Sequence, residues 1–211
     1  MSLPTYLSLP VLDWAPDWDG VSQQFSIRQE KTRLETAAGP LQDDAPDQPR
    51  PRTARRLRYM LDSRAEMLAA RDFLRDTVQG RWKGFWVPTW GEDLRVTDTV
   101  AADATTFAIT RMGAWRFYAG AGFGREHLAF FPRVPGSGPV LVPRKIASIA
   151  DWVDAETVTI DAAIGYALTT DDLVSFLLFC RADDDRLVLQ WETDHNGVLE
   201  LPLLDLPRET P

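Results

Sequence analysis

The chain has 211 residues, of which 45% are hydrophobic and 26% are charged, and this composition indicates a globular protein with a sizeable core. The formal net charge of -8 repels a phosphate backbone, so we expect no nucleic acid as the main partner. No stretch approaches the roughly 20 consecutive apolar residues that span a bilayer, so we expect no membrane insertion. Cys180 is the only cysteine, which excludes an internal disulfide and fits a chain made in a reducing cytoplasm.

The part of the chain before the first predicted helix is typical of strands around one polar loop. Residues 21–34 mix alternating apolar and polar side chains, which indicates one or two strands near a sheet edge. Residues 36–53 are rich in Pro, Gly and Asp and are predicted to form a loop. A strand follows, because Leu57, Tyr59 and Leu61 alternate with charged or polar neighbours.

Two runs of opposite charge lie in and after this loop. Asp43 and Asp44 belong to the acidic run, and Arg55 and Arg56 belong to the basic run. One interpretation is a solvated loop that leads into a strand. The other is that the two runs meet across a subunit boundary, although no pattern in the sequence locates the partner.

A helix is predicted from about residue 64 to residue 78. Ser63 and Glu66 form a capping box, in which the serine hydroxyl accepts from the Glu66 amide and the glutamate reaches back to the Ser63 amide. The apolar side chains that repeat at helical spacing are Met67, Ala70, Phe73 and Leu74. Gly80 stands where a left-handed C-cap residue is expected, so we predict a short helix with one face packed on a sheet.

Three of the eight tryptophans follow this helix closely, at Trp82, Trp86 and Trp90. Indole rings carry a large apolar area and one N–H donor, so such a cluster belongs in a packed core or in a protein interface. Residues 82–87 alternate as a strand. Because neighbours in a strand point to opposite sides, Phe85 and Trp86 are predicted to lie on opposite faces, one facing the core and the other a candidate contact surface.

The remainder of the chain is predicted to be mostly strands. Short strand-like segments are residues 105–110, 114–120, 127–132, 144–149 and 157–160, and the last two are of the kind that build small barrels. Residues 173–180 form a continuous apolar run, which indicates a central strand. The clearest hairpin joins residues 187–192 to residues 198–201, with Asn196 and Gly197 as a tight turn with positive φ angles. The elements together predict a mainly β fold, a β-sandwich or barrel with one short α-helix packed on the sheet.

The sequence offers no catalytic, cofactor-binding or metal-binding set. His127 and His195 lie in unrelated contexts, without a second ligand at metal spacing. The run Asp183–Asp185 lacks the glycine and the spaced acid of a calcium loop and is predicted to be a charged turn. Residues 120–124 have the spacing GxGxG without a parallel βαβ unit, which favours a barrel corner. We therefore expect a protein that is not an enzyme and that uses no cofactor.

Two blocks of the sequence resemble the distal tail proteins and related tail-tip components of long-tailed bacteriophages and gene transfer agents. The first block is similar to the family's short helix followed by a "G-R … F … D" strand and turn, and it consists of Phe73-Leu74, Gly80-Arg81, Gly84-Phe85-Trp86 and Asp93-Leu94. The second block, residues 179–187 with the closing residues 203–206, is similar to the family's terminal "R-F-D-x-D … L" strand. Ala182 replaces the aromatic residue of that pattern.

The resemblance implies one β-sandwich or barrel domain formed by residues 1–95 with residues 175–211, into which residues 96–174 are inserted as a small β-barrel-like module. It also implies a non-enzymatic virion structural protein of the phage tail tip, made in the bacterial host cytoplasm. Such proteins form a homo-oligomeric ring, commonly of six subunits, that joins the tail tube protein to the baseplate hub protein. The candidate interface residues are then Trp82, Trp86, Trp90, Arg55, Arg56, Asp43 and Asp44.

Two alternative functions remain open. In the first, the chain or its inserted module binds host-surface carbohydrate through exposed Trp115, Phe117 or Tyr118, which would stack on sugar rings. We favour instead that these aromatics fill a small barrel, because they are predicted to share a strand region with Phe107 and Ile109. In the second alternative, the protein is a tail-associated glycoside hydrolase, which requires a pair of carboxylates lining a deep cleft.

Overall fold

The protein is mostly β-structure, with 46% of residues in strands and 12% in helices. The computed structural model describes residues 3–18, 25–28, 33–36, 39–42, 52–118 and 125–206. Ten strands form one large antiparallel sheet in the order β3-β6-β16-β14-β9-β12-β13-β8, with β15 beside β16 and β7 beside β14. The predicted mainly β fold is confirmed, and among the described residues the sheet does not close into a barrel.

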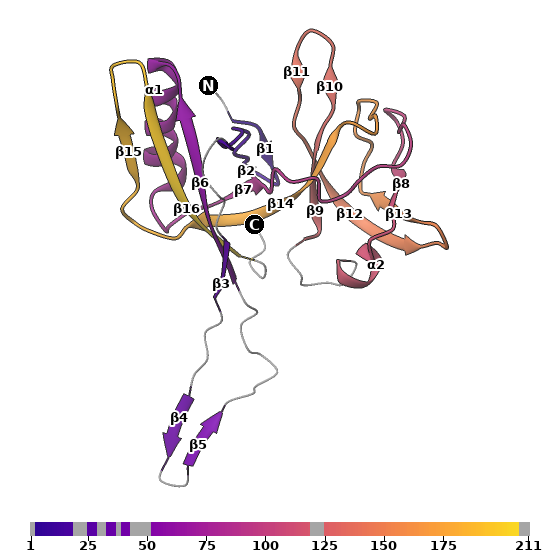
Figure 1. Ribbon diagram of the computed structural model, residues 1–211, viewed down its shortest axis with the longest axis horizontal. Helices are drawn as coiled ribbons and strands as arrows, with labels where there is room; N and C mark the ends of the chain where they lie inside the picture. Colours follow the sequence, from indigo (N-terminus) through magenta and orange to yellow (C-terminus); the bar gives the residue numbers. More distant parts are fainter. Residues whose placement is uncertain are drawn as a thin grey trace.

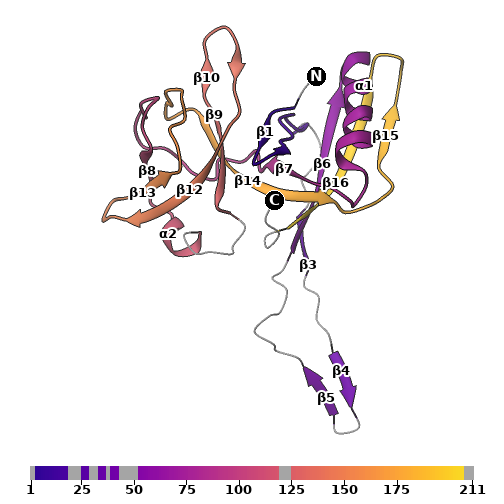
Figure 2. The same cartoon turned by 180° about the vertical axis from the view of Figure 1, so that it is seen from behind.

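Figure 1 and Figure 2 show two lobes that share the long strand β14 (Leu173–Ala182). The first lobe consists of β1 (Thr5–Tyr6), β2 (Leu9–Pro10), β3 (Phe25–Arg28), β6 (Arg52–Leu61), α1 (Arg64–Asp72), the π-helix η1 (Phe73–Val78), β7 (Gly84–Pro88), β15 (Val188–Trp191) and β16 (Gly197–Asp205). The second lobe consists of β8 (Thr106–Thr110), α2 (Ala114–Phe117), β9 (His127–Phe131), β10 (Arg133–Val134), β11 (Gly138–Pro139), β12 (Val142–Asp151) and β13 (Ala155–Ile160). A hairpin of β4 (Arg33–Thr36) and β5 (Gly39–Gln42) lies away from both lobes.

Strand β14 is hydrogen-bonded to strands of both lobes. Its residues 173–176 pair with β9 of the second lobe, and its residues 177–182 pair with β7 and β16 of the first lobe. The boundary predicted between residues 174 and 175 therefore falls inside this strand. Residues 174–178 are all buried, which confirms the central strand predicted from the continuous apolar run.

Helix α1 and the π-helix η1 together cover residues 64–78, as predicted. The Ser63 hydroxyl accepts a hydrogen bond from the Glu66 amide (3.2 Å). The Glu66 carboxylate accepts from the amide of Asp62 (2.8 Å), one residue before the donor that the capping box predicts. The buried side chains of this helical segment are Met67, Ala70, Phe73 and Val78. They close one side of the first lobe's core.

The N-terminal segment, residues 3–18, connects two edges of the first lobe. The Leu12 amide donates to the carbonyl of Trp86 in β7 (2.8 Å). Further along, the Asp17 amide donates to the carbonyl of Arg58 in β6 (2.8 Å). The segment thus runs from β7 to β6 and is joined to each strand by one of these hydrogen bonds. It covers part of the core without adding a continuous strand to the sheet.

In the second lobe, β12 holds two neighbours in place along its length. Its residues 142–145 pair with β9, and the part from residue 146 to residue 151 pairs with β13. The register changes between Ile146 and Ser148, and such an irregularity turns the strand so that its two halves meet different partners. The buried side chains of this lobe include Phe107, Ile109, Leu128, Phe130, Val158 and Ile160.

The strand predicted at residues 114–120 is absent from the part of it that the structure describes, residues 114–118. Residues 114–117 form the short helix α2, and the corner predicted at residues 120–124 lies outside the described residues. The buried carboxylate of Glu156 in β13 accepts hydrogen bonds from the amides of Met112 (3.1 Å), Ala114 (3.0 Å) and Trp115 (3.2 Å). Amides that converge on one carboxylate stabilise the start of a helical turn, which explains why the strand prediction is wrong.

Two turn regions also differ from the prediction. Strand β5 lies within the residues predicted to form a loop, and it pairs with β4. The terminal hairpin β15–β16 is present as predicted, but Asn196 and Gly197 do not have the positive φ angles of a tight turn. Instead, the amides of Glu192 and Thr193 both donate to the Asn196 carbonyl (3.0 and 3.1 Å) and close a longer turn.

Asp205 places a carboxyl group at the end of the first lobe's core. It lies opposite the buried Cys180 of β14, and one of its carboxylate oxygens is buried with no hydrogen-bond partner among the described residues. Burial raises the pKa of Asp205 to about 6, although the charges of Arg55 and Arg125 act in the opposite direction. The folded protein therefore holds this proton more tightly than the unfolded chain does.

We predict that Asp205→Asn stabilises the protein at neutral pH by about 2 kcal/mol, because it removes a carboxylate whose charged form burial disfavours. Wild-type stability should fall as the pH rises from about 4 through about 6, and this loss should be absent in the variant. Urea unfolding midpoints across this pH range measure the difference, with the exposed Asp171→Asn as the control. Identical pH profiles for the wild type and Asp205→Asn would contradict the prediction.

Candidate functional site

The loop that follows the helix is bound to a distant part of the chain. The Arg81 guanidinium donates two hydrogen bonds to the carbonyl of Asp183 (2.8 and 2.5 Å). The Arg81 amide donates to the Asp185 carboxylate (2.9 Å). These acceptors lie 102 and 104 residues further along the chain, in the loop after β14. We call residues 79–83 together with Asp183–Asp185 the helix–sheet joint.

Gly80 permits the close approach of the two loops in the helix–sheet joint. Its φ angle is +66°, and a Cβ atom at this position would lie 2.8 Å from a carboxylate oxygen of Asp185. Gln79, which ends η1, is also left-handed, with a φ angle of 50°. The left-handed cap predicted at Gly80 therefore extends over both residues, and only glycine fits the second of them without displacing Asp185.

The turn after β7, residues 89–94, is bound to β14. The Asp93 carboxylate accepts a hydrogen bond from the Phe176 amide (2.8 Å). The Asp93 amide donates to the Val174 carbonyl (3.1 Å). These bonds hold Trp90 at a φ angle of 59°, a left-handed conformation that costs a bulky residue about 1–2 kcal/mol. The turn is thus fixed against the strand that both lobes share.

Trp86 is a core residue. Its side chain is 1% exposed, and its indole N–H donates to the carbonyl of Tyr6 (3.1 Å). Phe85 is also buried, in the main core on the other side of β7, so the two side chains lie on opposite faces as predicted. The N-terminal segment covers the Trp86 side. Both faces of β7 are therefore covered within the subunit, and neither is the contact surface that the sequence led us to expect.

The other two tryptophans of the cluster differ in exposure. Trp90 is partly buried, and its ring packs on Phe131 with the ring centroids 4.8 Å apart. Trp82 is 83% exposed and lies within the helix–sheet joint. Among the three, Trp82 is thus the one that presents most of its ring to solvent and can offer a full indole face to a partner.

The structure describes only part of the two predicted runs of opposite charge. Asp43 and Asp44 lie outside the described residues. Arg56 is exposed and forms an ion pair with Glu200 at 3.7 Å. Arg55 is half-buried on the neighbouring position of β6, and its Nε atom is buried with no hydrogen-bond partner in the described part of the chain. Of the two arginines, Arg56 is therefore the one exposed to a partner.

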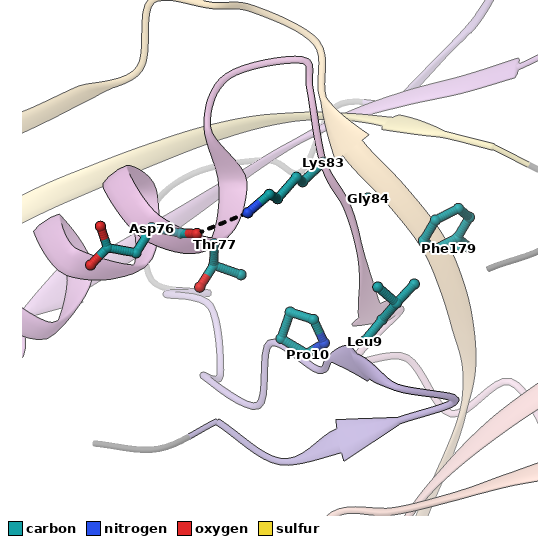
Figure 3. A pocket seen from close by; sticks show the side chains of 7 residues that line it. All are labelled: Leu9, Pro10, Asp76, Thr77, Lys83, Gly84 and Phe179. Carbon is teal, nitrogen blue, oxygen red and sulfur yellow. Dashed lines mark hydrogen bonds between the residues drawn. The ribbon is translucent and has the colours of Figure 1, made fainter.

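An open groove of about 420 Å³ lies beside the joint (Figure 3). Its lining residues come from β2, η1, β7, β14 and the loop before β7, and they are Leu9, Pro10, Asp76, Thr77, Lys83, Gly84 and Phe179. The Lys83 ammonium donates to the backbone carbonyl of Asp76 at the end of η1 (3.5 Å). The Asp76 carboxylate accepts from the Arg75 guanidinium (2.7 Å). The charged groups on the rim thus have partners of their own, around an apolar floor.

The side chains of His127 and Cys180 are bound or enclosed by other parts of the chain. His127 Nδ1 and the Tyr6 hydroxyl are hydrogen-bonded at 2.9 Å, and burial, with a smaller contribution from the Lys145 charge, lowers the pKa of His127 to about 4. Burial raises the pKa of the Cys180 thiol, which keeps it protonated.

The described residues contain no group of three or more His, Cys, Asp or Glu side chains placed to hold a metal ion. They also contain no helix long and apolar enough to cross a membrane.

The aromatic residues considered for carbohydrate binding lie partly at the surface. Trp115 and Phe117 of α2 are exposed. Tyr118 is partly buried and packs on Phe176, with ring centroids 4.9 Å apart. The expectation that all three fill a small barrel beside Phe107 is therefore wrong for Trp115 and Phe117, because they lie on a short helix and not on the strand that carries Phe107.

Two contributors to this region had no adequate signal in the sequence. Tyr6, which binds both Trp86 and His127, lies in an N-terminal segment too short to show a periodic pattern. The sequence predicts a charged turn at Asp183–Asp185, but nothing in it indicates Arg81 as the partner of that turn.

Comparisons with known proteins add no functional residue to this description. The sequence matches no protein-family model, and it matches no curated protein. The candidate site is therefore defined by its geometry, which consists of the helix–sheet joint, the exposed Trp82 within it and the groove beside it.

We predict that Gly80→Ala destabilises the protein by about 2 kcal/mol, because the new methyl group meets both an unfavourable φ angle and the Asp185 carboxylate. Gly136→Ala is the matched control, since Gly136 has a φ angle of +80° with no atom within 4 Å of the added group. It should cost only about 1 kcal/mol. Chemical unfolding of both variants measures the difference, and equal costs would show that the contact with Asp185 contributes nothing.

Proposed function

We propose that this protein is a non-enzymatic structural subunit of a phage tail tip, which forms a homo-oligomeric ring between the tail tube protein and the baseplate hub protein. In this proposal the chain is made in the bacterial host cytoplasm and ends in the virion. The ring uses heterologous contacts, in which one surface of a subunit meets a different surface of the next and the rotation closes.

The observation that carries the proposal is the helix–sheet joint. The two sequence blocks that resemble tail-tip proteins are far apart in the chain, and they meet where Arg81 binds Asp183 and Asp185. A resemblance that rests on a shared fold predicts such a meeting, whereas a chance resemblance does not. Trp82 lies in the same joint with 83% of its surface exposed, and a rigidly held, exposed indole is typical of an interface anchor.

The hairpin β4–β5 supports the proposal independently. Figure 1 shows it apart from both lobes, so its two strands pair with each other away from the large sheet. A two-stranded hairpin alone is marginally stable in water, because it has no core to cover its faces. A hairpin set apart from the large sheet in this way is suited to pack on a neighbouring subunit.

The glycoside hydrolase alternative receives no support from the groove. Asp76 is the one carboxylate among its lining residues, and this side chain already accepts from Arg75. Hydrolysis of a glycosidic bond needs two carboxyl groups on opposite sides of that bond. The groove therefore does not support hydrolysis, whereas the exposure of Trp115 and Phe117 favours the carbohydrate-binding alternative as an additional property.

We predict that Trp82→Ala weakens self-association by about tenfold or more while leaving the unfolding free energy of the subunit within about 0.5 kcal/mol of wild type. Trp86→Ala is the contrasting variant, because it empties a core position and should cost about 3–5 kcal/mol of stability. Sedimentation velocity over a concentration series measures the association, and urea unfolding measures the stability. Self-association of Trp82→Ala at wild-type strength would remove Trp82 from the interface.

A further inference from the structure

The hairpin β1–β2 lies between the two lobes and covers part of the sheet that they share (Figure 1 and Figure 2). Each of its strands has two residues, and Tyr6 is paired with Leu9. Both side chains pack against a cluster of buried residues on this face of the sheet. The members of the cluster are Val11, Trp86, Ala129, Phe131 and Leu177. The hairpin is thus a small lid over an apolar surface.

The turn of this hairpin is strained. Leu7 and Ser8 have φ angles of 48° and 66°, so both central residues of the turn are left-handed. Two-residue turns of this kind favour Asn and Gly, because other side chains adopt the left-handed conformation at a cost in free energy. Leu7 is 53% exposed, so packing compensates little for its conformation. The hairpin therefore depends on its contacts with the sheet to stay closed.

Tyr6 supplies the polar part of these contacts. Its carbonyl accepts from the Trp86 indole N–H (3.1 Å), and its hydroxyl is hydrogen-bonded to Nδ1 of His127 at the start of β9 (2.9 Å). The three rings pack together, and the ring centroids of Trp86 and His127 are 4.6 Å apart. A tyrosine of the first lobe is therefore bound to a histidine of the second lobe.

The surroundings of His127 disfavour a positive charge while the hairpin is closed. Burial under the hairpin lowers the pKa of His127 to about 4, with a smaller contribution from the charge of Lys145, which is its pairing partner on β12. The charges of Glu126 and Asp161 act in the opposite direction. The charged groups that face His127 or Tyr6 are Lys145, Arg144, Glu126 and Asp161.

We propose that the hairpin β1–β2 is an acid-sensitive lid, which leaves the sheet when His127 takes up a proton. Opening lets water reach the imidazole, so the open form binds the proton as an ordinary histidine does, whereas the closed form resists it. The closed form is therefore fully favoured above a pH of about 6.5, and this preference is lost as the pH falls to about 4. Between pH 7 and pH 4.5 the opening equilibrium rises by up to about 50-fold.

Opening of the lid changes the groove beside the helix–sheet joint. Leu9 and Pro10 of β2 form one side of this groove, and Phe179 is among its other lining residues (Figure 3). Without β2, the groove joins the apolar face of the sheet that carries Trp86 and Leu177. The lid thus controls how much apolar surface the first lobe presents. This proposal does not depend on ring formation, because the lid and its latch belong to one subunit.

Hydrogen–deuterium exchange of the full chain at pH 7 and at pH 4.5, corrected for the intrinsic exchange rate at each pH, tests the lid. The Val11 amide reports opening, because it donates to the Pro4 carbonyl (2.8 Å) and a two-residue hairpin released from the sheet is not stable alone. We expect its protection to fall by about tenfold to 50-fold at pH 4.5, while residues 174–178 of β14 stay protected.

His127→Gln should abolish this fall, because the amide side chain is neutral at both pH values. His195→Gln is the matched control, since the exposed His195 should leave the fall unchanged. The proposal is overturned if the wild-type protection of the Val11 amide is the same at both pH values, or if it falls equally in His127→Gln. Should His127→Gln also lose the protection of β14, an NMR titration of His127 in the wild type decides. Protonation of His127 together with loss of the Val11 protection would support the lid, and protonation while the Val11 amide stays protected would overturn it.

Discussion

The hydrogen bonds of strand β14 are the constraint on which the rest of the structure depends. On one part of its length β14 pairs with β9 of the second lobe, and on the other it pairs with β7 and β16 of the first. The turn that contains Asp93 binds it as well, through the Phe176 amide and the Val174 carbonyl. The two lobes are therefore two ends of one sheet, and neither can rotate without breaking the ladder in its buried centre.

The same strand determines what the surface of the first lobe offers. Strand β7 lies beside β14, and the N-terminal segment covers the Trp86 side of β7, so Phe85 and Trp86 are each buried in a core. The loop before β7 is then fixed by Arg81 against the loop that leaves β14. Trp82 is thereby held in solvent by a rigid support, and an exposed indole on a rigid support is the feature most consistent with an assembly contact.

Local patterns predicted the elements whose partners lie nearby in the chain. The capping box at Ser63 and Glu66 marked the start of the helix, and the apolar run at residues 173–180 marked the central strand. The prediction of a strand at Trp115 was wrong because Glu156, 41 residues away, binds that backbone as a helical turn. The helix–sheet joint likewise could not be predicted from the sequence, because no local pattern connects Arg81 to Asp183. A tertiary contact of this kind overrides local propensity.

Negative-stain electron microscopy of the purified protein shows directly whether the subunit assembles into a closed ring. We expect class averages with a closed ring of two-lobed subunits, whose first lobes meet one another near Trp82. Particles that remain single two-lobed subunits at every concentration and salt condition, with no ring among them, would contradict it.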